Sequence, residues 1–387
     1  MTTVFPEAEF QQRCAHAQAA MARAGVAALL LTGEADVRYF SGFLTRFWES
    51  PTRPWFLVIP AMGKPVAVIP GIGAELMGAT WVEDIRTWAA PDYKDDGVSL
   101  LGETLRQVTG PGARIGVPMG RETQLRMPLG DWSRLCAALA GREMVDATGI
   151  IQAQQQVKSP AEIALIREIC AIGGRAFARV PEIAVPGVTL AQLFRRFQMA
   201  LLEEGADWVP YLAGGAGQGG YGDVISPARD VPLARGDLVM LDTGAMRQGY
   251  FCDFDRNWAL GEATPQVMEA NRILFDATEA GFAAARPGAT MADLYHAMAG
   301  VIAAAGDAGA GGRLGHGLGM RLTDPPSIVP ADHTVLAPGM VLTLEPALQM
   351  GVGRMMVHEE DIVIGEAGAE WLTPRGLREL PVLEWGA

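Results

Sequence analysis

Three aspartates lie close together in one short segment, LDTGAMRQGYFCDFD at residues 241–255. Asp242 is near its start, Asp253 follows eleven residues later, and Asp255 comes two residues after that. The apolar residues around them predict two neighbouring strands. Acids that paired strands aim at one spot repel each other unless a positive charge compensates them. The spacing therefore predicts carboxylates gathered around a cation.

A second group of chemically capable residues lies nearer the C-terminus. Glu345 in LTLEP and Glu359 in VHEED interrupt apolar strand patterns, and His316 lies among glycines in GRLGHGLGM. Taken singly, such an acid can be an edge or turn residue, and such a His can be a loop residue. An unpaired acid in an apolar strand is costly, however. Carboxylates with one imidazole suit divalent metals, and four acids favour two ions that share bridging carboxylates.

Two domains are expected to position these residues, because 387 residues exceed one ordinary core. Residues 1–155 alternate buried strands with helices, which predicts an α/β domain. Residues 156–387 form the second domain, and its first helix is predicted to start with a capping box in VKSPAE. The elements expected in the first domain are helices at 7–24 and 98–107 and strands at 26–33, 55–60, 65–70 and 113–118.

The second domain repeats the order helix, helix, strand, strand. This repeat predicts a pseudo-two-fold domain in which two pairs of strands face each other, so the whole chain is mixed α/β (α+β). The expected helices lie at 157–180, 189–204, 265–285 and 290–305, and the expected strands lie at 237–245, 249–260, 340–348 and 354–364.

Composition excludes several classes of function. The net charge is -13, the sequence pI is about 4.9, and no basic run occurs, so a nucleic-acid partner is not expected. No apolar run approaches the roughly 18 residues of a membrane helix, and the N-terminus does not resemble a signal peptide. The four cysteines lack CxxC spacing, which favours a reduced, cytoplasmic compartment.

These motifs resemble those of the pita-bread metallohydrolases, which include methionine aminopeptidase, prolidase, aminopeptidase P and creatinase. That family's ligands are Asp, a second Asp eleven residues later, His in a GHG motif, Glu before Pro, and a final Glu followed by an acidic or amide residue. Glu359 is preferred to Glu360 as the final one, because strand alternation turns Glu360 to the opposite face. The resemblance implies that the metal ligands are Asp242, Asp253, His316, Glu345 and Glu359.

The resemblance covers most of the chain and implies its other features. VRYFSGF at 37–43 is similar to the smaller domain of prolidase, aminopeptidase P and creatinase. Residues 1–155 are thus expected to be a creatinase/prolidase-like domain and residues 156–387 a pita-bread catalytic domain. The expected cofactors are two divalent metal ions, manganese first, with cobalt, zinc or iron as alternatives. A homodimer is expected by analogy.

Several residues depart from the peptidases of this family. Thr323 in LTDPP and Ile225 in VISPARD stand where these peptidases carry histidines, and neither side chain can move a proton near neutral pH as His does. Val357 stands where an Arg is often found, and Asp255 replaces a Thr. These departures leave the metal ligands intact and put the peptide substrate in question.

Side chains near the predicted metals are candidates for substrate binding. Asp255 is expected on the same strand face as Asp253, with a salt bridge to Arg256 or a solvated position as the alternative. His358 could replace a missing histidine, or it packs behind the site as strand alternation favours. The glycine-rich segment 213–226 lacks the ending of a P-loop and is expected to be a flexible loop that covers the substrate.

The segment TRFWESPTRPWF at 45–56 supplies three further candidates. Arg53 would suit a substrate carboxylate, and the faces of Trp48 and Trp55 would suit a cation or a ring. The alternative is that Trp55 begins a buried strand and Arg53 lies on the surface. The full set of predicted substrate contacts is Asp255, Thr323, Trp48, Arg53, Trp55 and His358.

Three functions are compatible with these residues. The first is a dinuclear metallohydrolase resembling Xaa-Pro dipeptidase or aminopeptidase, in which a metal-bridging hydroxide attacks an amide carbon and Glu345 or Glu359 takes the proton. The second is the same site acting on a small non-peptide metabolite, as a C–N hydrolase like creatinase and ectoine hydrolase or as a lyase like dimethylsulfoniopropionate lyase. The third is a non-catalytic binding protein, which would have no reason to keep five ligands.

Overall fold

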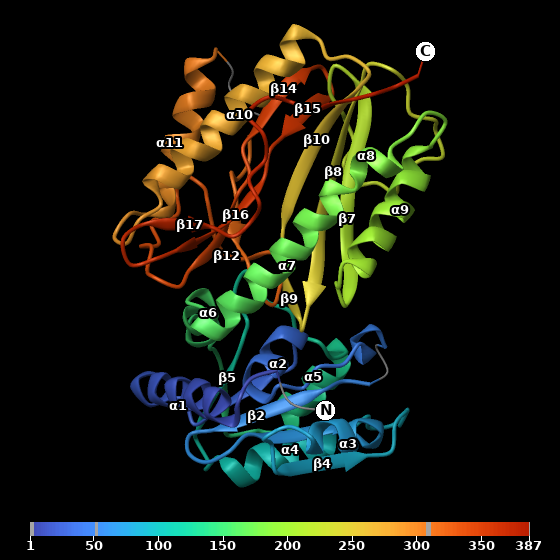
Figure 1. The fold of residues 1–387 in the computed structure, drawn as a ribbon. Helices are drawn as coiled ribbons and strands as arrows, with labels where there is room; N and C mark the ends of the chain where they lie inside the picture. The colour runs from blue at the N-terminus through green and yellow to red at the C-terminus, as the bar shows by residue number, and fades with distance from the viewer. Residues whose placement is uncertain (1–3, 51–52, 307–310, 387) are drawn as a thin grey trace. The chain divides into compact units, whose positions relative to one another are not determined.

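The computed structural model describes residues 4–50, 53–306 and 311–386. Its backbone contacts divide the chain into two compact units, Met1–Gln155 and Gln156–Ala387. The helices and strands of both units are labelled along the chain in Figure 1.

The first unit is built on a six-stranded sheet in the order β4-β3-β2-β1-β5-β6. β2 is antiparallel to both of its neighbours, and the other pairs are parallel. β1 and β3 are buried along their whole length, as their continuous apolar runs predict. The elements are α1 (Glu7–Ala24), β1 (Ala28–Leu31), α2 (Glu34–Ser41), η1 (Phe47–Glu49), β2 (Phe56–Pro60), β3 (Val66–Pro70), η2 (Gly71–Gly73), α3 (Ala74–Gly78), β4 (Asp84–Trp88), α4 (Val98–Val108), β5 (Arg114–Val117), α5 (Leu129–Ala138), β6 (Glu143–Asp146) and α6 (Thr148–Gln156), which ends at the boundary.

The second unit contains two larger sheets, β18-β10-β8-β7 with β9 beside β8, and β12-β11-β13-β16-β17, together with the hairpin β14-β15. In Figure 1 the helices α10 and α11 lie along one side of these strands, and α7 to α9 lie along another. The elements are α7 (Pro160–Ala178), α8 (Val180–Ile183), α9 (Leu190–Glu203), β7 (Trp208–Gln218), β8 (Asp237–Arg247), β9 (Tyr250–Phe251), β10 (Phe254–Leu260), α10 (Pro265–Ala284), α11 (Met291–Ala304), β11 (His316–Gly317), β12 (Asp324–Ser327), β13 (Val341–Leu344), β14 (Ala347–Gly351), β15 (Arg354–Val357), β16 (Glu360–Ile364), β17 (Ala369–Trp371) and β18 (Val382–Leu383).

The long helices of the second unit start at capping residues. Ser159 accepts a hydrogen bond from the Glu162 backbone N–H at 3.3 Å, and the Glu162 side chain accepts one from the Ser159 N–H at 2.9 Å. This is the predicted capping box, which satisfies two of the N–H groups that a helix start leaves unpaired. Thr189 and Thr290 start α9 and α11 with the same reciprocal box, whereas Thr264 caps α10 only by accepting the Val267 N–H.

Three strands of the second unit are shorter than the sequence predicts. The runs 249–260, 340–348 and 354–364 are each interrupted at an acid, namely Asp253, Glu345 and Glu359. At each interruption the acid's backbone N–H bonds outside the predicted strand pair, so the pairing stops there. The acids therefore leave the regular alternation of strand faces. Only Asp255 lies in β10, so strand alternation alone does not place Asp253 on the same face, and a shared face of the two aspartates stays a prediction.

The sequence predicts one flexible loop over the glycine-rich segment 213–226, and the structure shows that this prediction is wrong. Its first part continues β7 as far as Gln218, paired with β8 over Ala213↔Asp242 to Gln218↔Asp237. Gly214 is needed there, because its φ is +145° and a Cβ would lie 2.2 Å from the Met240 carbonyl oxygen. The segment is thus the end of an edge strand followed by turns.

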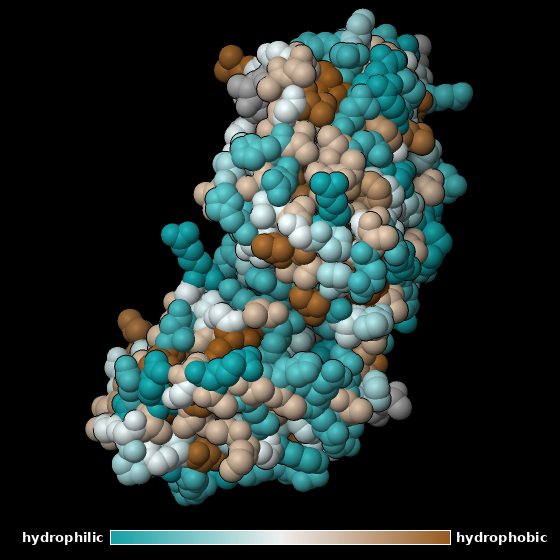
Figure 2. Space-filling view, turned by 90° about the vertical axis from the view of Figure 1, so that its left-hand side faces the viewer, coloured by the Kyte–Doolittle hydropathy of each residue, from teal (hydrophilic) through white to brown (hydrophobic). Residues whose placement is uncertain are grey.

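Hydrophobic residues on the molecular face of Figure 2 form separate small groups among hydrophilic ones. Over the described residues, none of the helices combines the length and the apolar character needed to cross a membrane.

Candidate metal centre

Asp253, His316 and Glu359 come together in the second unit. Each offers one ligand atom, and these atoms all lie within 4.8 Å of one another. His316 Nε2 is 3.4 Å from Asp253 Oδ2. The three side chains are buried and come from the β9–β10 break, from β11 and from the β15–β16 break. Asp253 and His316 are 63 positions apart in the sequence, and His316 and Glu359 are 43 positions apart. The three residues nevertheless meet at one point, in an arrangement that could hold a divalent ion.

Asp242 and Glu345 act electrostatically on the same cluster. Asp242 lies in β8, directly opposite Asp255 of β10. Burial raises the pKa of Asp242 to about 6, and burial together with the charge of Asp242 raises the pKa of Glu345 to about 7. Burial and then the charge of Asp253 raise the pKa of Glu359 as well, with Glu345 and Asp242 adding to the rise. The five predicted ligands therefore form one group of mutually repelling acids around an imidazole.

Buried oxygens without partners indicate what this group lacks. In the described chain, Asp242 Oδ1 and Glu359 Oε1 are buried and accept no hydrogen bond. An unpaired buried carboxylate oxygen is costly, and a cation among these acids would satisfy both oxygens and offset the repulsion. The donor set of oxygens and one imidazole nitrogen therefore fits divalent metal ions.

The histidine is oriented for coordination. His316 Nδ1 lies 2.9 Å from the Gly317 carbonyl oxygen, which fits an N–H donated there and leaves the Nε2 lone pair facing Asp253. Burial, followed by the charge of Arg313, lowers the pKa of His316 to about 4, so the ring is neutral. The flanking glycines are required by packing, since a Cβ would lie 2.2 Å from the Thr343 carbonyl oxygen at Gly315 and 2.6 Å from the Pro325 carbonyl oxygen at Gly317.

Two further buried aspartates hold the backbones of Asp253 and Glu359. Asp361 Oδ2 accepts the Asp253 N–H at 3.0 Å, and Asp255 Oδ1 accepts the Glu359 N–H at 2.7 Å. The pattern is reciprocal, because each aspartate lies two residues after one predicted ligand and holds the other one. Sequence reasoning placed Asp255 at the site but missed Asp361. The signal was present, since Asp253-Phe254-Asp255 and Glu359-Glu360-Asp361 have the same spacing.

His358 and Glu360 lie in a separate cluster of charges. Glu360 binds Arg256 at 3.0 Å and Arg375 at 2.7 Å, and the His358 Nε2 lies 3.4 Å from Glu360 Oε1. The His358 ring also packs on Phe275. Arg256 therefore pairs with Glu360 and uses only the backbone carbonyl of Asp255. His358 has these structural neighbours, and its contact with a substrate stays a prediction.

Three residues bear on the question of the missing histidines. Thr323 accepts a hydrogen bond from Arg313 Nη2 at 3.4 Å, just before β12, which pairs with His316. Ile225 is 86% exposed in the turn after β7. Tyr211, which sequence reasoning missed, donates from its hydroxyl to Asp242 Oδ2 at 3.1 Å. Tyr211 therefore steadies one predicted ligand, and Thr323 faces a guanidinium.

The aromatic candidates of the first unit are packed into its interior. Trp48 and Trp55 are 3% and 2% exposed, and their ring centroids lie 6.1 Å apart. Arg53 lies over the Phe47 ring at 4.9 Å and donates to the Ser50 hydroxyl at 3.3 Å. Trp55 is thus a core residue that precedes a buried strand. A role of these three residues toward a substrate stays a prediction.

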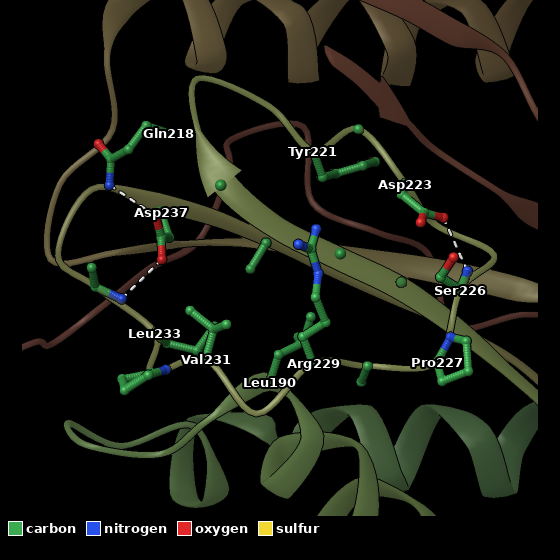
Figure 3. A pocket seen from close by; sticks show the side chains of 18 residues that line it. Leu190, Gln218, Tyr221, Asp223, Ser226, Pro227, Arg229, Val231, Leu233 and Asp237 are labelled. Carbon is green, nitrogen blue, oxygen red and sulfur yellow. Dashed lines mark hydrogen bonds between the residues drawn. The ribbon is translucent and has the colours of Figure 1, made fainter. Parts of the chain in front are cut away.

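A pocket of about 460 Å³ lies elsewhere in the second unit, between β7 and segment 226–234 (Figure 3). Asp237 at its edge accepts hydrogen bonds from the Gln218 side chain and the Ala234 N–H, both at 2.8 Å. None of the five predicted metal ligands lines this pocket. It is therefore separate from the acid cluster.

Comparisons with known proteins agree with these features. Residues 164–366, more than half of the chain, match the model of metallopeptidase family M24, and residues 13–157 match the creatinase/prolidase N-terminal domain. A probable dipeptidase PepE of Mycobacterium bovis is 33% identical over 359 residues, which cover 92% of this chain and 92% of that protein. An agropine synthesis cyclase of Rhizobium rhizogenes is 29% identical over 398 aligned positions, covering 94% and 96%.

A solved structure has the same fold. The crystal structure of dipeptidase PepE from Mycobacterium ulcerans matches with a TM-score of 0.84 and 31% identity, covering 98% of this chain and 99% of that one. The predicted pita-bread resemblance, the mixed α/β class and the assignment to a class of metal-dependent hydrolases are thereby confirmed. The chain belongs to metallopeptidase family M24 and carries a creatinase/prolidase-type N-terminal domain.

Proposed function

We propose that the protein is a dinuclear metal-dependent hydrolase that cleaves the amide bond of a short peptide, with Xaa-Pro dipeptides as the first substrates to test. The observation that carries the proposal is the meeting of Asp253, His316 and Glu359 within 4.8 Å, with Asp242 and Glu345 coupled to them. These five residues would hold two divalent ions, manganese first. Bound there, such ions supply a Lewis acid and lower the pKa of water.

Within this proposal Glu345 and Glu359 have different tasks. Glu359 is 2% exposed and its backbone is fixed by Asp255, so it serves mainly as a rigid ligand. Glu345 is half-buried, so it is the more accessible of the two carboxylates. A carboxylate that a reacting group can reach is able to take up and return a proton. Glu345 is therefore the stronger candidate for proton transfer to the leaving amine.

The test combines metal analysis and activity on one sample. The protein is loaded with Mn²⁺, its metal content is measured by elemental analysis, and Xaa-Pro dipeptides and tripeptides are offered. We expect about two metals per chain and cleavage, and Asp253→Asn should lose both. Asp324→Asn is the matched control, because Asp324 is a buried acid of the same unit that pairs with Arg321. Absence of bound metal in the wild type would refute the proposal.

A second function rests on the replaced histidines. Ile225 and Thr323 cannot assist proton transfer at a peptide bond, and one relative of similar length is named a cyclase and not a peptidase. The same metal site would then act on a small non-peptide metabolite, through C–N hydrolysis or lyase chemistry. Two bound metals without cleavage of any peptide, together with turnover of a small nitrogen-containing metabolite, would favour this second function.

The proposal includes a cytoplasmic homodimer. All four cysteines are free, which suits a reducing compartment, and the dimer is carried over from the resemblance. Light scattering after size-exclusion chromatography measures the mass of the particle. A mass near 41.2 kDa, that of one chain, would refute the dimer.

A further inference from the structure

An arginine without a partner extends into the pocket between β7 and segment 226–234. Arg229 belongs to that segment, and in Figure 3 its side chain crosses the pocket toward β7. Among the described residues, its guanidinium has no hydrogen bond and no ion pair. Asp230 is next to it in the sequence, but the Asp230 Oδ1 accepts the Thr189 hydroxyl at 2.7 Å. The pocket therefore contains one cation that the surrounding protein leaves unpaired.

Hydrogen bonds hold the backbone around Arg229 in place. The Arg229 carbonyl accepts the Ala191 N–H at 3.1 Å, and the Val231 carbonyl accepts the Leu190 N–H at 3.1 Å. Both donors belong to the first turn of α9, where N–H groups have no partner within the helix. The segment is thus fixed against α9. The arginine side chain starts from this fixed backbone, although the side chain itself is exposed.

Another wall of the pocket is the outer edge of β7. This strand is at the end of its sheet, next to β8. The Gly214 N–H points away from β8, since it donates to the Val224 carbonyl at 3.2 Å. In an antiparallel pair every second residue turns its N–H and C=O outward, so those of Ala216 also face away from β8. No backbone hydrogen bond of the described chain outside the strand ladders uses these two groups. The edge therefore offers one donor and one acceptor to a molecule in the pocket.

The rest of the lining suits a molecule with an apolar body. Leu190, Val231 and Leu233 give the pocket apolar side chains, and Gly215 and Gly217 have no side chain to fill the space beside the β7 backbone. Glycines inside a strand often mark a place where a ligand approaches the backbone closely. The volume of about 460 Å³ lies in the range of about 300–1,000 Å³ that is typical of sites for small molecules.

Two acids in the lining limit the charge that a ligand can carry. Asp223 Oδ1 accepts the Ile225 and Ser226 N–H groups at 3.1 and 3.0 Å, and Asp237 is likewise held by N–H donors. Hydrogen bonds from Ser226 lower the pKa of Asp223, and the charge of Arg229 adds to this lowering. The lining thus contains one cation and two anions. A ligand with a single negative charge is therefore favoured over a dianion such as a phosphate ester.

We propose that this pocket binds a small monocarboxylate with an apolar body, at a site separate from the metal centre. The carboxylate pairs with Arg229, because the N–H donors of a guanidinium form a planar fork that matches a carboxylate. The apolar body contacts Leu190, Val231 and Leu233, and an amide next to the carboxylate bonds to the Ala216 backbone. N-acetyl-leucine has all three features, since it combines a carboxylate, an amide and an isobutyl group.

Calorimetry with N-acetyl-leucine tests the site, and N-acetyl-leucinamide and inorganic phosphate serve as comparisons. We expect one saturable site that binds the free acid about 10–100-fold more tightly than the amide, which is the range of a charge-assisted hydrogen bond, and that binds phosphate more weakly than the acid. Arg229→Met should remove the preference for the acid, Arg229→Lys should keep part of it, and Val231→Asp should weaken acid binding by repulsion. Arg195→Met should keep the preference, because Arg195 is an exposed arginine of the same unit that does not line the pocket.

Asp253→Asn distinguishes binding in this pocket from binding at the metal centre. The substitution changes a predicted metal ligand and leaves the lining of the pocket intact. N-acetyl-leucine should therefore bind to Asp253→Asn as tightly as to the wild type, with or without Mn²⁺. Loss of binding in this variant would place the probe at the metal centre and overturn the inference. Absence of saturable binding, equal binding of acid and amide, tighter binding of phosphate, or unchanged acid binding in Arg229→Met would overturn it as well. Circular dichroism on every variant shows that a loss is not caused by misfolding.

Discussion

The reciprocal aspartates give the sharpest prediction about the metal centre. Asp361 accepts the Asp253 N–H at 3.0 Å and the Cys170 thiol at 3.3 Å, both through Oδ2. Asp361→Asn keeps the shape of the side chain and removes its charge. The backbone of Asp253 then loses a charge-assisted hydrogen bond, although an amide oxygen can still accept in its place. Asp255→Asn makes the same change on the Glu359 side, where the bond is 2.7 Å.

The expected fall in metal affinity follows from the strength of the hydrogen bond that each substitution weakens. Hydrogen bonds to charged groups contribute about 1.5–3 kcal/mol and neutral ones about 0.5–1.5 kcal/mol, so the substitution loses roughly 1–2 kcal/mol of positioning. At 1.4 kcal/mol per tenfold, metal affinity should fall by about 5–30-fold for either variant. Partners of metal ligands generally have effects of this order.

The stability of the metal-free protein should change in the other direction. Burial raises the pKa of Asp361, which means that the folded state disfavours its charged form. A carboxyl whose folded pKa is raised destabilises the fold at a pH above its unfolded pKa. Removing it should leave the metal-free melting temperature equal or higher while metal binding weakens. A purely structural role would lower both.

The assay is a chelator competition for Mn²⁺ affinity, with thermal melting of the metal-free and metal-loaded forms. Asp324→Asn serves as the control, because Asp324 pairs with Arg321 and holds no predicted ligand. Wild-type metal affinity in both Asp361→Asn and Asp255→Asn would refute the positioning role. A fall in only one variant would mean that the symmetry of the pattern does not extend to its energetics.

Three further predictions concern the same unit. Burial raises the pKa of Asp242 to about 6 and that of Glu345 to about 7, so both groups bind more protons in the folded state than in the unfolded state. The free energy of unfolding of the metal-free protein should therefore fall by about 3 kcal/mol for each group as the pH rises from about 4 to 7. Urea unfolding at pH 5 and pH 8 checks this fall, and bound Mn²⁺ should make it smaller. Tyr211→Phe removes the hydrogen bond that Asp242 Oδ2 accepts from the Tyr211 hydroxyl and should weaken Mn²⁺ binding about tenfold in the chelator assay, whereas unchanged affinity would show that the hydroxyl is dispensable. Glu360→Gln leaves Arg256 and Arg375 without their shared buried partner and should cost about 3–5 kcal/mol in urea unfolding, and a loss below 1 kcal/mol would contradict the pairing.

The sequence predicts the elements well where one physical rule dominates. The apolar runs of β1 and β3, the capping box at Ser159 and the helix pairs of the second unit all lie close to their predicted bounds. The prediction fails where tertiary bonds replace ladder bonds. Asp253 and Glu359 donate their backbone N–H groups to Asp361 and Asp255, so strand pairing is interrupted at both residues. No local sequence pattern predicts these interruptions. Tyr211 is missed for the same reason, since its hydrogen bond to Asp242 joins residues 31 positions apart in the sequence.

The adjacent acids Glu359 and Glu360 show how burial alone fails to distinguish a site from a structural pair. Both are almost fully buried, and burial by itself would raise the pKa of each. Glu360 is surrounded by Arg256, Arg375 and the Thr373 hydroxyl, so its pKa falls below the ordinary value. Glu359 has acids for neighbours and a buried oxygen without a partner, so its pKa rises. The fold thus compensates one charge with its own cations and leaves the other to be compensated from outside, and this difference is the physical reason to expect a metal ion beside Glu359.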